Sequence, residues 1–369
     1  MTMLYRELGN SGLRVSLLSF GSMRWQSEEA CHEIIQRGMD LGMNYIDTST
    51  GYVGGQSLKW SGRAVRGRRE QILFACKSNW SSAPNESAVR RSIESALRSA
   101  ELEYFDLYQL WGLRSLHTLK QALAPGGTVE GIRRAQSEGL VRYGAGFTFH
   151  GSPDVFRAAI DSGEFLAATV SYNLSKRKEE GLIRYAYEHG VGIIIMNPLA
   201  GGVLARKGDK RLHFLAGNGA GPAYGALRFL FANQHISTCL LGLRSIAELE
   251  EDIRALKDAE SLNETYRSEL ARQYAAARLA QGNFCTGCGY CADCPQDVGP
   301  EKLMPLLRDY QIASGGVTLA EWLRAAYMPE NPLERLERCI ACGQCEANCP
   351  QQLPIMDEID RAREALRNR

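Results

Sequence analysis

The sequence predicts a two-part α/β protein, a (β/α)8 or TIM barrel followed by a smaller α-helical domain rich in cysteine. Two observations lead to this prediction. Between residues 15 and 259 a strand-like apolar segment alternates with a helix-like segment eight times, and eight such units over about 250 residues are typical of a (β/α)8 barrel. After residue 259 this alternation stops, and eight of the eleven cysteines fall in two short runs.

The barrel is predicted element by element. Tyr5–Val15, with a turn at Asn10 to Gly12, indicates a short hairpin at the lower end of the barrel. The eight strands are expected at Val15–Gly21, Tyr45–Ser49, Ile72–Lys77, Phe105–Trp111, Val141–Thr148, Ala167–Asn173, Gly192–Leu199 and Ser237–Leu243. Amphipathic stretches between them predict helices such as Glu28–Leu41, Asn85–Ala100, Pro153–Ser162 and Lys178–His189. An open doubly wound sheet is the alternative, but no G-x-G-x-x-G motif follows the first strand.

We expect the barrel to span residues 1–262 and the second domain to span residues 263–369. A charged helix at about Asn263–Ala280 would lead into the first cysteine run. Further helices are expected at Glu301–Tyr310, Leu319–Tyr327 and Met356–Arg367.

Composition excludes several classes of protein. The formal net charge of +1 gives no reason to expect nucleic acid or an anionic membrane as a partner. The most apolar stretch, Val191–Ala205, is interrupted by Asn197, Pro198 and two glycines, so we expect no membrane span. The N-terminus lacks the features of a signal peptide. A cytoplasmic protein is therefore expected, and nothing in the sequence indicates an oligomeric state.

The two cysteine runs have the spacing of iron–sulfur ligands. They read Cys285-x2-Cys288-x2-Cys291-x2-Cys294-Pro295 and Cys339-x2-Cys342-x2-Cys345-x3-Cys349-Pro350. In two-cluster ferredoxins, the cysteine beside the proline ligates the cluster of the other run. We therefore expect two [4Fe-4S] clusters in a ferredoxin-like domain, the first held by Cys285, Cys288, Cys291 and Cys349, the second by Cys339, Cys342, Cys345 and Cys294. Zinc is the alternative, although zinc sites usually space their cysteine pairs further apart.

Motifs along the barrel resemble the aldo-keto reductases. They are YRELGNSGLRVS from Tyr5, NYIDTSTGY from Asn44, FDLYQLW from Phe105, NPLAGG from Asn197 and AELEEDI from Ala247. The joined cysteine tail resembles the ferredoxin-bearing subgroup of that family, so the resemblance covers nearly the whole chain. It implies an oxidoreductase whose active site lies at the C-terminal mouth of the barrel.

The resemblance implies four catalytic positions, Asp47, Tyr52, Lys77 and Trp111, the last of which stands where the family usually has histidine. A tyrosine that protonates a carbonyl needs a lowered pKa. A nearby ammonium lowers the pKa of the tyrosine, and a carboxylate orients that ammonium. Indole can donate a hydrogen bond but cannot shuttle a proton. The alternative is that Asp47 and Lys77 form a structural ion pair and Tyr52 is a loop aromatic.

The cofactor end of the site departs further from the family. Thr148, Phe149, Thr169 and Met196 match positions that hold the nicotinamide in the family, and Pro198 and Leu199 follow. The phosphate end is better retained, with Gly242, Arg244 and Ser245 at a helix start. The resemblance implies that Glu248, Glu251 and Asp252 flank an adenine.

Three functions follow from these residues. The favoured hypothesis is an oxidoreductase that exchanges electrons between its clusters and a flavin (FMN) in the barrel mouth, because nicotinamide moves electrons as a pair and each cluster moves one. Its substrate would be an organic carbonyl, alcohol or related small molecule, and an external carrier such as a ferredoxin would be a partner. The alternatives are an NADP(H)-dependent carbonyl reductase with structural or accessory clusters, and a non-catalytic electron-transfer or scaffold subunit. His150 could replace the missing acid, whereas Arg114 is expected at the surface.

Overall fold

A computed structural model describes residues 3–217, 220–277, 284–313, 317–326 and 331–368. Eight parallel strands close into a barrel in the order β10-β3-β4-β5-β6-β7-β8-β9, which confirms the (β/α)8 prediction and excludes the open sheet. The strands are β3 (Leu18–Gly21), β4 (Tyr45–Asp47), β5 (Leu73–Asn79), β6 (Phe105–Trp111), β7 (Val141–Thr148), β8 (Ala167–Ser171), β9 (Gly192–Met196) and β10 (Thr238–Leu241).

The first expected strand, Val15–Gly21, is in fact two strands. Its beginning belongs to β2 (Arg14–Ser16), which pairs antiparallel with β1 (Tyr5–Glu7) in the predicted hairpin. The break follows from a side-chain contact, because the Ser16 N–H donates to Asn44 Oδ1 (2.7 Å). The Asn10 N–H donates to the carbonyl of Gly190, just before β9, so the hairpin lies at the amino ends of the strands as expected.

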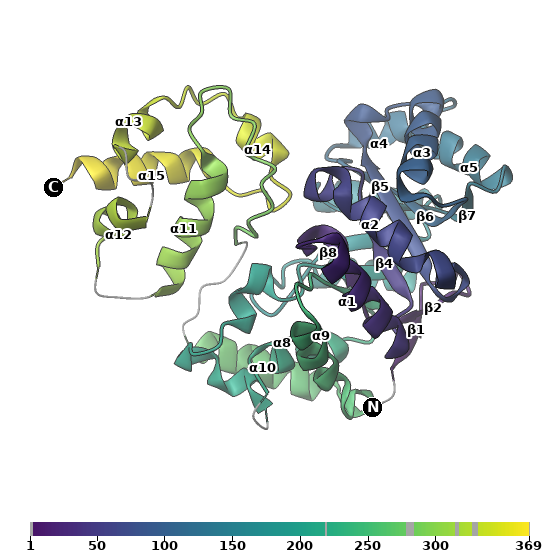
Figure 1. Cartoon of the computed structure of the whole chain (residues 1–369), viewed down its shortest axis with the longest axis horizontal. Coiled ribbons are helices and arrows are strands. Elements are labelled where there is room, and N and C mark those ends of the chain that lie inside the picture. The colour runs from purple at the N-terminus through teal and green to yellow at the C-terminus, as the bar shows by residue number, and fades with distance from the viewer. Residues whose placement is uncertain (1–2, 218–219, 278–283, 314–316, 327–330, 369) are drawn as a thin grey trace.

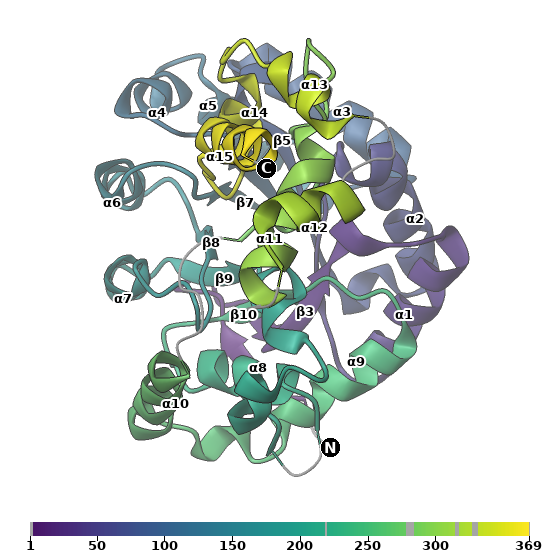
Figure 2. The same ribbon diagram turned by 90° about the vertical axis from the view of Figure 1, so that its left-hand side faces the viewer.

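Helices surround the barrel (Figure 2), and their buried apolar residues belong to its core. The first helices begin at polar caps: Ser27 Oγ accepts the Ala30 N–H before α1, and Asn85 Oδ1 accepts the Ala88 N–H before α3. The helices are α1 (Glu28–Asp40), α2 (Gln56–Val65), α3 (Glu86–Ala100), α4 (Leu116–Leu123), α5 (Thr128–Ser137), α6 (Pro153–Asp161), α7 (Glu180–Glu188), α8 (Ala223–Phe231), α9 (Ile246–Ile253) and α10 (Glu264–Ala276).

Helix α10 lies with the barrel, although the predicted boundary after residue 262 assigned it to the second domain. Its Leu270 and Tyr274 are buried in the core of the barrel, and Arg267 donates to the Tyr172 hydroxyl (3.0 Å). Figures 1 and 2 both show α10 beside α8. Helix α10 therefore packs on the barrel, and the boundary after residue 262 stays a prediction.

The C-terminal domain is a group of short helices with its own core (Figure 1). They are α11 (Pro300–Ala313), α12 (Leu319–Ala326), α13 (Pro332–Glu337), α14 (Gln344–Asn348) and α15 (Ile355–Arg367). Leu303, Leu323, Leu336 and Ile359 are buried together, and cysteines of both runs pack against them. The predicted helices within 301–326 and 356–367 are confirmed, whereas Tyr327 lies outside the described residues.

The C-terminal domain is seated on the carboxyl ends of the barrel strands. The Arg24 guanidinium donates to the carbonyls of Thr286 and Gly287 in the first cysteine run. The Gln352 side chain donates to the carbonyl of His150 just beyond β7. Of the helices that the structure describes, none has the length and apolar character needed to cross a membrane.

A buried ion pair between Asp106 and Arg69 lies beside the neighbouring strands β5 and β6. Asp106 in β6 pairs with Arg69 (2.7 Å) and accepts the N–H of Phe74 in β5 (2.8 Å). Removing one partner of such a pair leaves a buried charge.

We expect Asp106→Asn to lower the free energy of unfolding by about 3 kcal/mol, because Arg69 would then be buried without a counter-charge. The measurement is the chemical denaturation of both proteins followed by circular dichroism. Glu101→Gln is the control, because Glu101 pairs with Arg63 and Arg66 at the surface and such pairs contribute less than about 1 kcal/mol. Equal losses in the two variants would contradict the prediction.

Candidate active site at the barrel mouth

A cavity of about 870 Å³ opens at the carboxyl ends of the strands. This volume lies in the range usual for small-molecule and cofactor sites. The barrel contributes most of the lining, including Asp47, Tyr52, Lys77, Trp111, Thr148, His150, Thr169, Met196, Pro198 and Leu199. The C-terminal domain contributes the opposite wall, including Thr286, Gly287, Tyr290, Arg308 and Gln351. The cavity is therefore enclosed by both domains.

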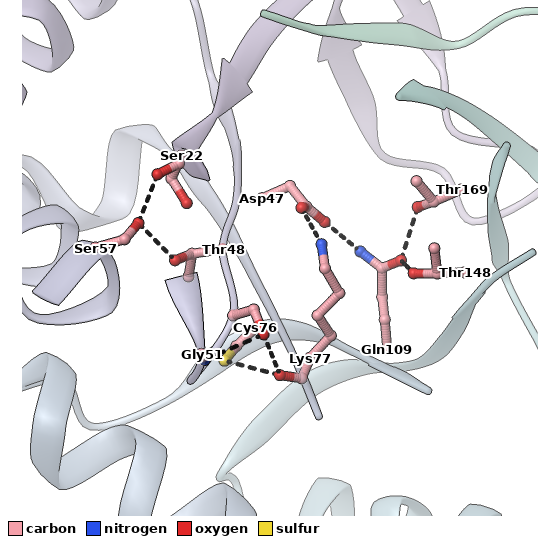
Figure 3. A network of polar contacts seen from close by, with 11 residues as sticks. Ser22, Asp47, Thr48, Gly51, Ser57, Cys76, Lys77, Gln109, Thr148 and Thr169 are labelled. Atoms are coloured by element: carbon pink, nitrogen blue, oxygen red, sulfur yellow. Dashed lines mark hydrogen bonds and ion pairs between the residues drawn. The ribbon is translucent and has the colours of Figure 1, made fainter. Parts of the chain in front are cut away.

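A buried polar network forms the floor of the cavity (Figure 3). Lys77 Nζ contacts Asp47 Oδ1, and Gln109 Nε2 donates to Asp47 Oδ2 (2.7 Å). The Thr169 and Thr148 hydroxyls both donate to Gln109 Oε1, at 2.7 and 3.4 Å. Both oxygens of the Asp47 carboxylate thus have a partner. Thr148 and Thr169, which the sequence analysis assigned to cofactor binding, donate their hydroxyl protons to Gln109.

Sequence reasoning missed Gln109. It precedes Trp111 by two positions in β6, and side chains two apart in a strand share a face. Strand alternation alone would have placed it on the inner face of the barrel.

Tyr52 lies beside Lys77 in an arrangement that differs from the expected one. Lys77 Nζ stands 5.0 Å from the centroid of the Tyr52 ring. The pKa of Tyr52 is raised well above its ordinary value by burial and by the charge of Asp47, whereas the expectation was a lowered pKa. The Tyr290 side chain is a hydrogen-bond partner of Tyr52. Tyr52 is thus a neutral phenol on the cavity wall.

Aromatic rings form one wall of the mouth. Trp111 faces Tyr290 with ring centroids 5.1 Å apart, and it meets the edge of the His150 ring at 6.2 Å. His150 is buried, and its pKa falls to about 3 through burial and the nearby charges of Arg114 and Lys176. Its ring is therefore neutral at physiological pH. Tyr290 comes from the first cysteine run, and nothing in the spacing of that run indicated that it would enter the mouth.

Two predicted cofactor residues point elsewhere. Phe149 packs against Phe156 of α6 (4.9 Å between centroids), away from the cavity, because side chains alternate along the chain and Thr148 takes the inward position. The Ser245 hydroxyl caps α9 by accepting the Glu248 N–H (3.2 Å). Arg114, expected at the surface, is partly buried, which lowers its pKa.

The end of the cavity near α9 is rich in paired charges. Arg244 binds Glu248 through its guanidinium (2.9 and 3.1 Å) and its backbone N–H (2.8 Å). Lys207 pairs with Glu251 (2.6 Å). Gly242 and Asp252 also line this end. The arginine predicted to hold a phosphate thus already has an anionic partner, and its role in phosphate binding stays a prediction.

Two small cavities in the C-terminal domain are each lined by four cysteines. The first is lined by Cys285, Cys288, Cys291 and Cys349, and the second by Cys294, Cys339, Cys342 and Cys345. Each set combines three cysteines of one run with the last cysteine of the other, which is the grouping expected for two-cluster ferredoxins. Four thiols around one cavity fit an iron–sulfur cluster in donor type and number. These thiols surround a cavity and do not converge on one point: within the described ranges, no group of three or more His, Cys, Asp or Glu side chains is arranged to hold a single metal ion.

The first cysteine cavity and the barrel mouth share a wall. Thr286, Gly287, Tyr290 and Gln351 line both cavities. A cluster bound by the first cysteine set would therefore lie one layer of residues from the barrel mouth.

The class of protein follows from this barrel mouth together with comparisons to known families. The profile of the aldo/keto reductase family matches residues 17–267, and that of a 4Fe-4S dicluster domain matches residues 284–353. The chain belongs to the aldo/keto reductase family and carries a 4Fe-4S domain at its C-terminal end. It is therefore an oxidoreductase of aldo-keto reductase type.

Individual relatives agree with this assignment. The chain is 27% identical over 290 residues to L-galactose dehydrogenase of Arabidopsis thaliana, covering 70% of this chain and 89% of the relative. It is 24% identical over 283 residues to YqkF, an uncharacterised oxidoreductase of Bacillus subtilis, covering 68% and 90%.

Solved structures show the same barrel fold. An aldo-keto reductase of Bacillus halodurans in its holo form superposes with a TM-score of 0.63 at 24% identity, covering 73% of this chain and 96% of its own. An aldo/keto reductase of Klebsiella pneumoniae in complex with NADP and acetate gives 0.61 at 21% identity, covering 72% and 94%.

The neutral state of His150 predicts a pH dependence of stability. The unfolded chain binds a proton on this histidine below about pH 6.5, whereas the native ring binds it only near pH 3. The stability is thus complete above about pH 6.5 and is lost as the pH falls toward 3. We expect the wild type to lose about 1.4 kcal/mol more than His150→Gln between pH 7.5 and 5.5.

Denaturant unfolding of both proteins at the two pH values measures this difference. His32→Gln, at an exposed position of α1, is the matched control and should behave as the wild type. Identical pH dependence of wild type and His150→Gln would refute a neutral His150.

Proposed function

We propose that this chain is an iron–sulfur oxidoreductase in which electrons pass between the cluster held by Cys285, Cys288, Cys291 and Cys349 and a redox cofactor in the barrel mouth. The substrate is an organic carbonyl, alcohol or related small molecule. The observation that supports this function is the shared wall, because Thr286, Gly287, Tyr290 and Gln351 line both cavities. The second cluster would be held by Cys294, Cys339, Cys342 and Cys345.

The ligand sets link the two cysteine runs into one unit. Both sets border a single apolar core, so the two clusters would lie close together. Cys342 is exposed, and the neighbouring Ile340 has 63% of its surface accessible. The second cluster would therefore meet solvent, where an external one-electron carrier such as a ferredoxin can approach.

Flavin (FMN) and NADP(H) are the two cofactors proposed from the sequence. A flavin would supply the conversion between paired and single electrons that clusters require. A specific observation favours the second function, an NADP(H)-dependent carbonyl reductase with accessory clusters: Asp47, Tyr52 and Lys77 line one cavity, and the Klebsiella relative binds NADP. The presence of these three residues in one cavity also argues against the third function, a non-catalytic electron-transfer or scaffold subunit.

Each polar residue of the mouth has a distinct role in the proposed reaction. The neutral Tyr52 phenol donates a proton to the substrate oxygen, as general acids do. Asp47, held by Gln109, fixes the ammonium of Lys77 beside the Tyr52 ring, where its charge stabilises the phenolate that forms. The Trp111 and Tyr290 rings stack on each other and line the cavity with Tyr52.

Cysteine replacements test the crossed ligand sets. Two [4Fe-4S] clusters predict about eight irons and eight sulfides per chain in anaerobically purified protein. We expect Cys349→Ser to lose the cluster beside the mouth and Cys294→Ser to lose the other, each leaving about four irons. Iron and sulfide analysis with electron paramagnetic resonance measures both.

Cys239→Ser, which alters a buried cysteine of the barrel core, is the control and should keep all its iron. Zinc without sulfide in the purified protein would overturn the iron–sulfur assignment. If Cys294→Ser lost the first cluster and Cys349→Ser the second, the assignment of these two cysteines to the opposite cluster would be wrong. The iron–sulfur assignment itself would stand.

Tyr52→Phe tests the proton donor. We expect the rate of carbonyl reduction to fall by about 10²–10⁴-fold, because the substrate oxygen loses its acid, while iron content and cluster spectra stay unchanged. Tyr143→Phe, at an exposed position of β7, is the control. Steady-state kinetics and freeze-quench spectra on the same samples provide the readout.

The freeze-quench spectra also distinguish the two functions. Cluster oxidation or reduction within one turnover supports electron exchange with the mouth. Clusters that keep one redox state during turnover would favour the carbonyl reductase, and full activity of Tyr52→Phe would exclude Tyr52 as the acid in either.

A further inference from the structure

Tyr290 is a residue of the cysteine domain that reaches into the barrel mouth. It lies between Cys288 and Cys291 of the first cysteine run, and its side chain lines both the mouth and the first cysteine cavity. Its ring packs on that of Trp111, with centroids 5.1 Å apart and ring planes inclined by 35°. A side chain flanked by two predicted cluster ligands and stacked on the barrel thus joins the two domains at the mouth.

The backbone before Tyr290 explains how one short loop borders both cavities. Gly287 and Gly289 have positive φ angles of 66° and 79°, a region that favours glycine. A Cβ at either position would meet no atom within 4 Å, so the requirement for glycine is conformational and not steric. These two left-handed residues, on either side of Cys288, let Cys288 line the cysteine cavity while Tyr290 also reaches the mouth.

The side chain of Tyr290 is a hydrogen-bond partner of Tyr52. Burial and the charge of Asp47 raise the pKa of Tyr52, whereas its hydrogen bond with Tyr290 lowers it. A hydrogen bond lowers the pKa of a phenol when it is donated to the phenol oxygen, because it then favours the charged form. Tyr290 is therefore the donor and Tyr52 the acceptor, which leaves the Tyr52 proton available to a substrate.

The donors on the floor of the mouth are directed at one another. Lys77 Nζ stands over the Tyr52 ring, 5.0 Å from its centroid, and contacts Asp47. The Gln109 amide donates to the other oxygen of Asp47, and two threonine hydroxyls donate to Gln109. Tyr290 thus brings to the Tyr52 oxygen a donor that lies outside this network and belongs to the other domain.

We propose that Tyr290 is a positioning residue for the acid of the barrel: its hydroxyl donates a hydrogen bond to the Tyr52 oxygen and stabilises the phenolate that forms when Tyr52 protonates the substrate. In that step the Tyr52 O–H bond breaks, its electron pair stays on the Tyr52 oxygen, and the proton forms an O–H bond with the carbonyl oxygen. The hydride equivalent that reduces the carbonyl carbon comes from the redox cofactor of the proposed function, on which this inference rests. Solvent then returns a proton to Tyr52.

The hydrogen bond from Tyr290 contributes more as the reaction proceeds. A hydrogen bond to a phenolate is stronger than one to a neutral phenol, so the Tyr290 hydroxyl acts mainly on the transition state. Its loss should lower kcat and leave KM nearly unchanged. The cysteine domain would then have a second role in the reaction, one that requires no electron transfer.

Tyr290→Phe tests this role, because it keeps the ring on Trp111 and removes the hydroxyl. Turnover of a simple aldehyde is measured with NADPH or with dithionite as electron donor, which covers both cofactors proposed for the mouth. We expect kcat to fall by about tenfold, as for the loss of one hydrogen bond to a charged group, with KM within about twofold of the wild-type value. Iron and sulfide contents should equal those of the wild type.

A double-mutant cycle with Tyr52→Phe distinguishes this role from a structural one. In the Tyr52→Phe background, Tyr290→Phe should change the remaining rate by less than about twofold, because its effect passes through Tyr52. A purely structural contribution would lower the rate by the same factor in both backgrounds. Tyr310→Phe is the matched control, because Tyr310 lies in α11 of the same domain, beside Trp322, and lines neither cavity.

Binding of acetate provides a readout that needs no turnover. A carboxylate oxygen beside Tyr52 accepts the phenol proton, and the hydrogen bond from Tyr290 polarises that phenol. We expect acetate to bind about threefold more weakly to Tyr290→Phe than to the wild type. In the Tyr52→Phe background the same substitution should make no difference. Isothermal titration calorimetry on the full, anaerobically purified chain measures these affinities.

The outcomes separate this inference from the proposed function. Equal values for wild type and Tyr290→Phe in both measurements would overturn the inference, and so would equal losses in the two backgrounds. Loss of activity in Tyr52→Phe but not in Tyr290→Phe would overturn only the role of Tyr290, whereas full activity of Tyr52→Phe removes the proposed acid as well. A wild type that neither reduces the aldehyde nor binds acetate would overturn both proposals.

Discussion

The contacts of the segment Cys285–Gly287 are the constraint that brings the cysteine domain to the barrel mouth. Arg24 comes from the barrel and Arg308 from the C-terminal domain, and both donate to backbone carbonyls of this segment. The parallel strands bring their carboxyl ends to one mouth. Arg24 holds the cysteine loop over this mouth, and Arg308 supports the loop from within its own domain. Without that seating, the barrel would be an ordinary open reductase barrel and the cysteine domain a separate body.

The sequence predicted the barrel because its signals are local and repeated. Eight apolar segments of strand length, each followed by an amphipathic stretch, determine both the number of strands and the parallel topology. The cysteine spacing likewise predicted which thiols gather in each cavity. The limits of the elements were less certain: the segment around Val15–Gly21 is divided by the contact of Asn44 with Ser16, which joins residues far apart in the sequence.

The site was predicted only in part, because its electrostatics depend on packing between domains. Tyr52 was expected to have a lowered pKa, yet burial and the charge of Asp47 raise it. Tyr290 reaches the mouth from the first cysteine run, so its role depends on domain docking that no local pattern encodes. Gln109 is different, since strand alternation alone could have placed it beside Asp47.

Because both domains line the barrel mouth, binding of a ligand there is coupled to docking of the cysteine domain on the barrel. Asp47 and Lys77 belong to the barrel, and Thr286 and Tyr290 belong to the cysteine domain, so an occupant of the cavity contacts both. A molecule that binds only the docked arrangement stabilises it by about 2.7 kcal/mol at one hundred times its Kd. Occupancy of the mouth would thus set how firmly the iron–sulfur domain is held against the barrel, and hence how constant the path for electrons remains.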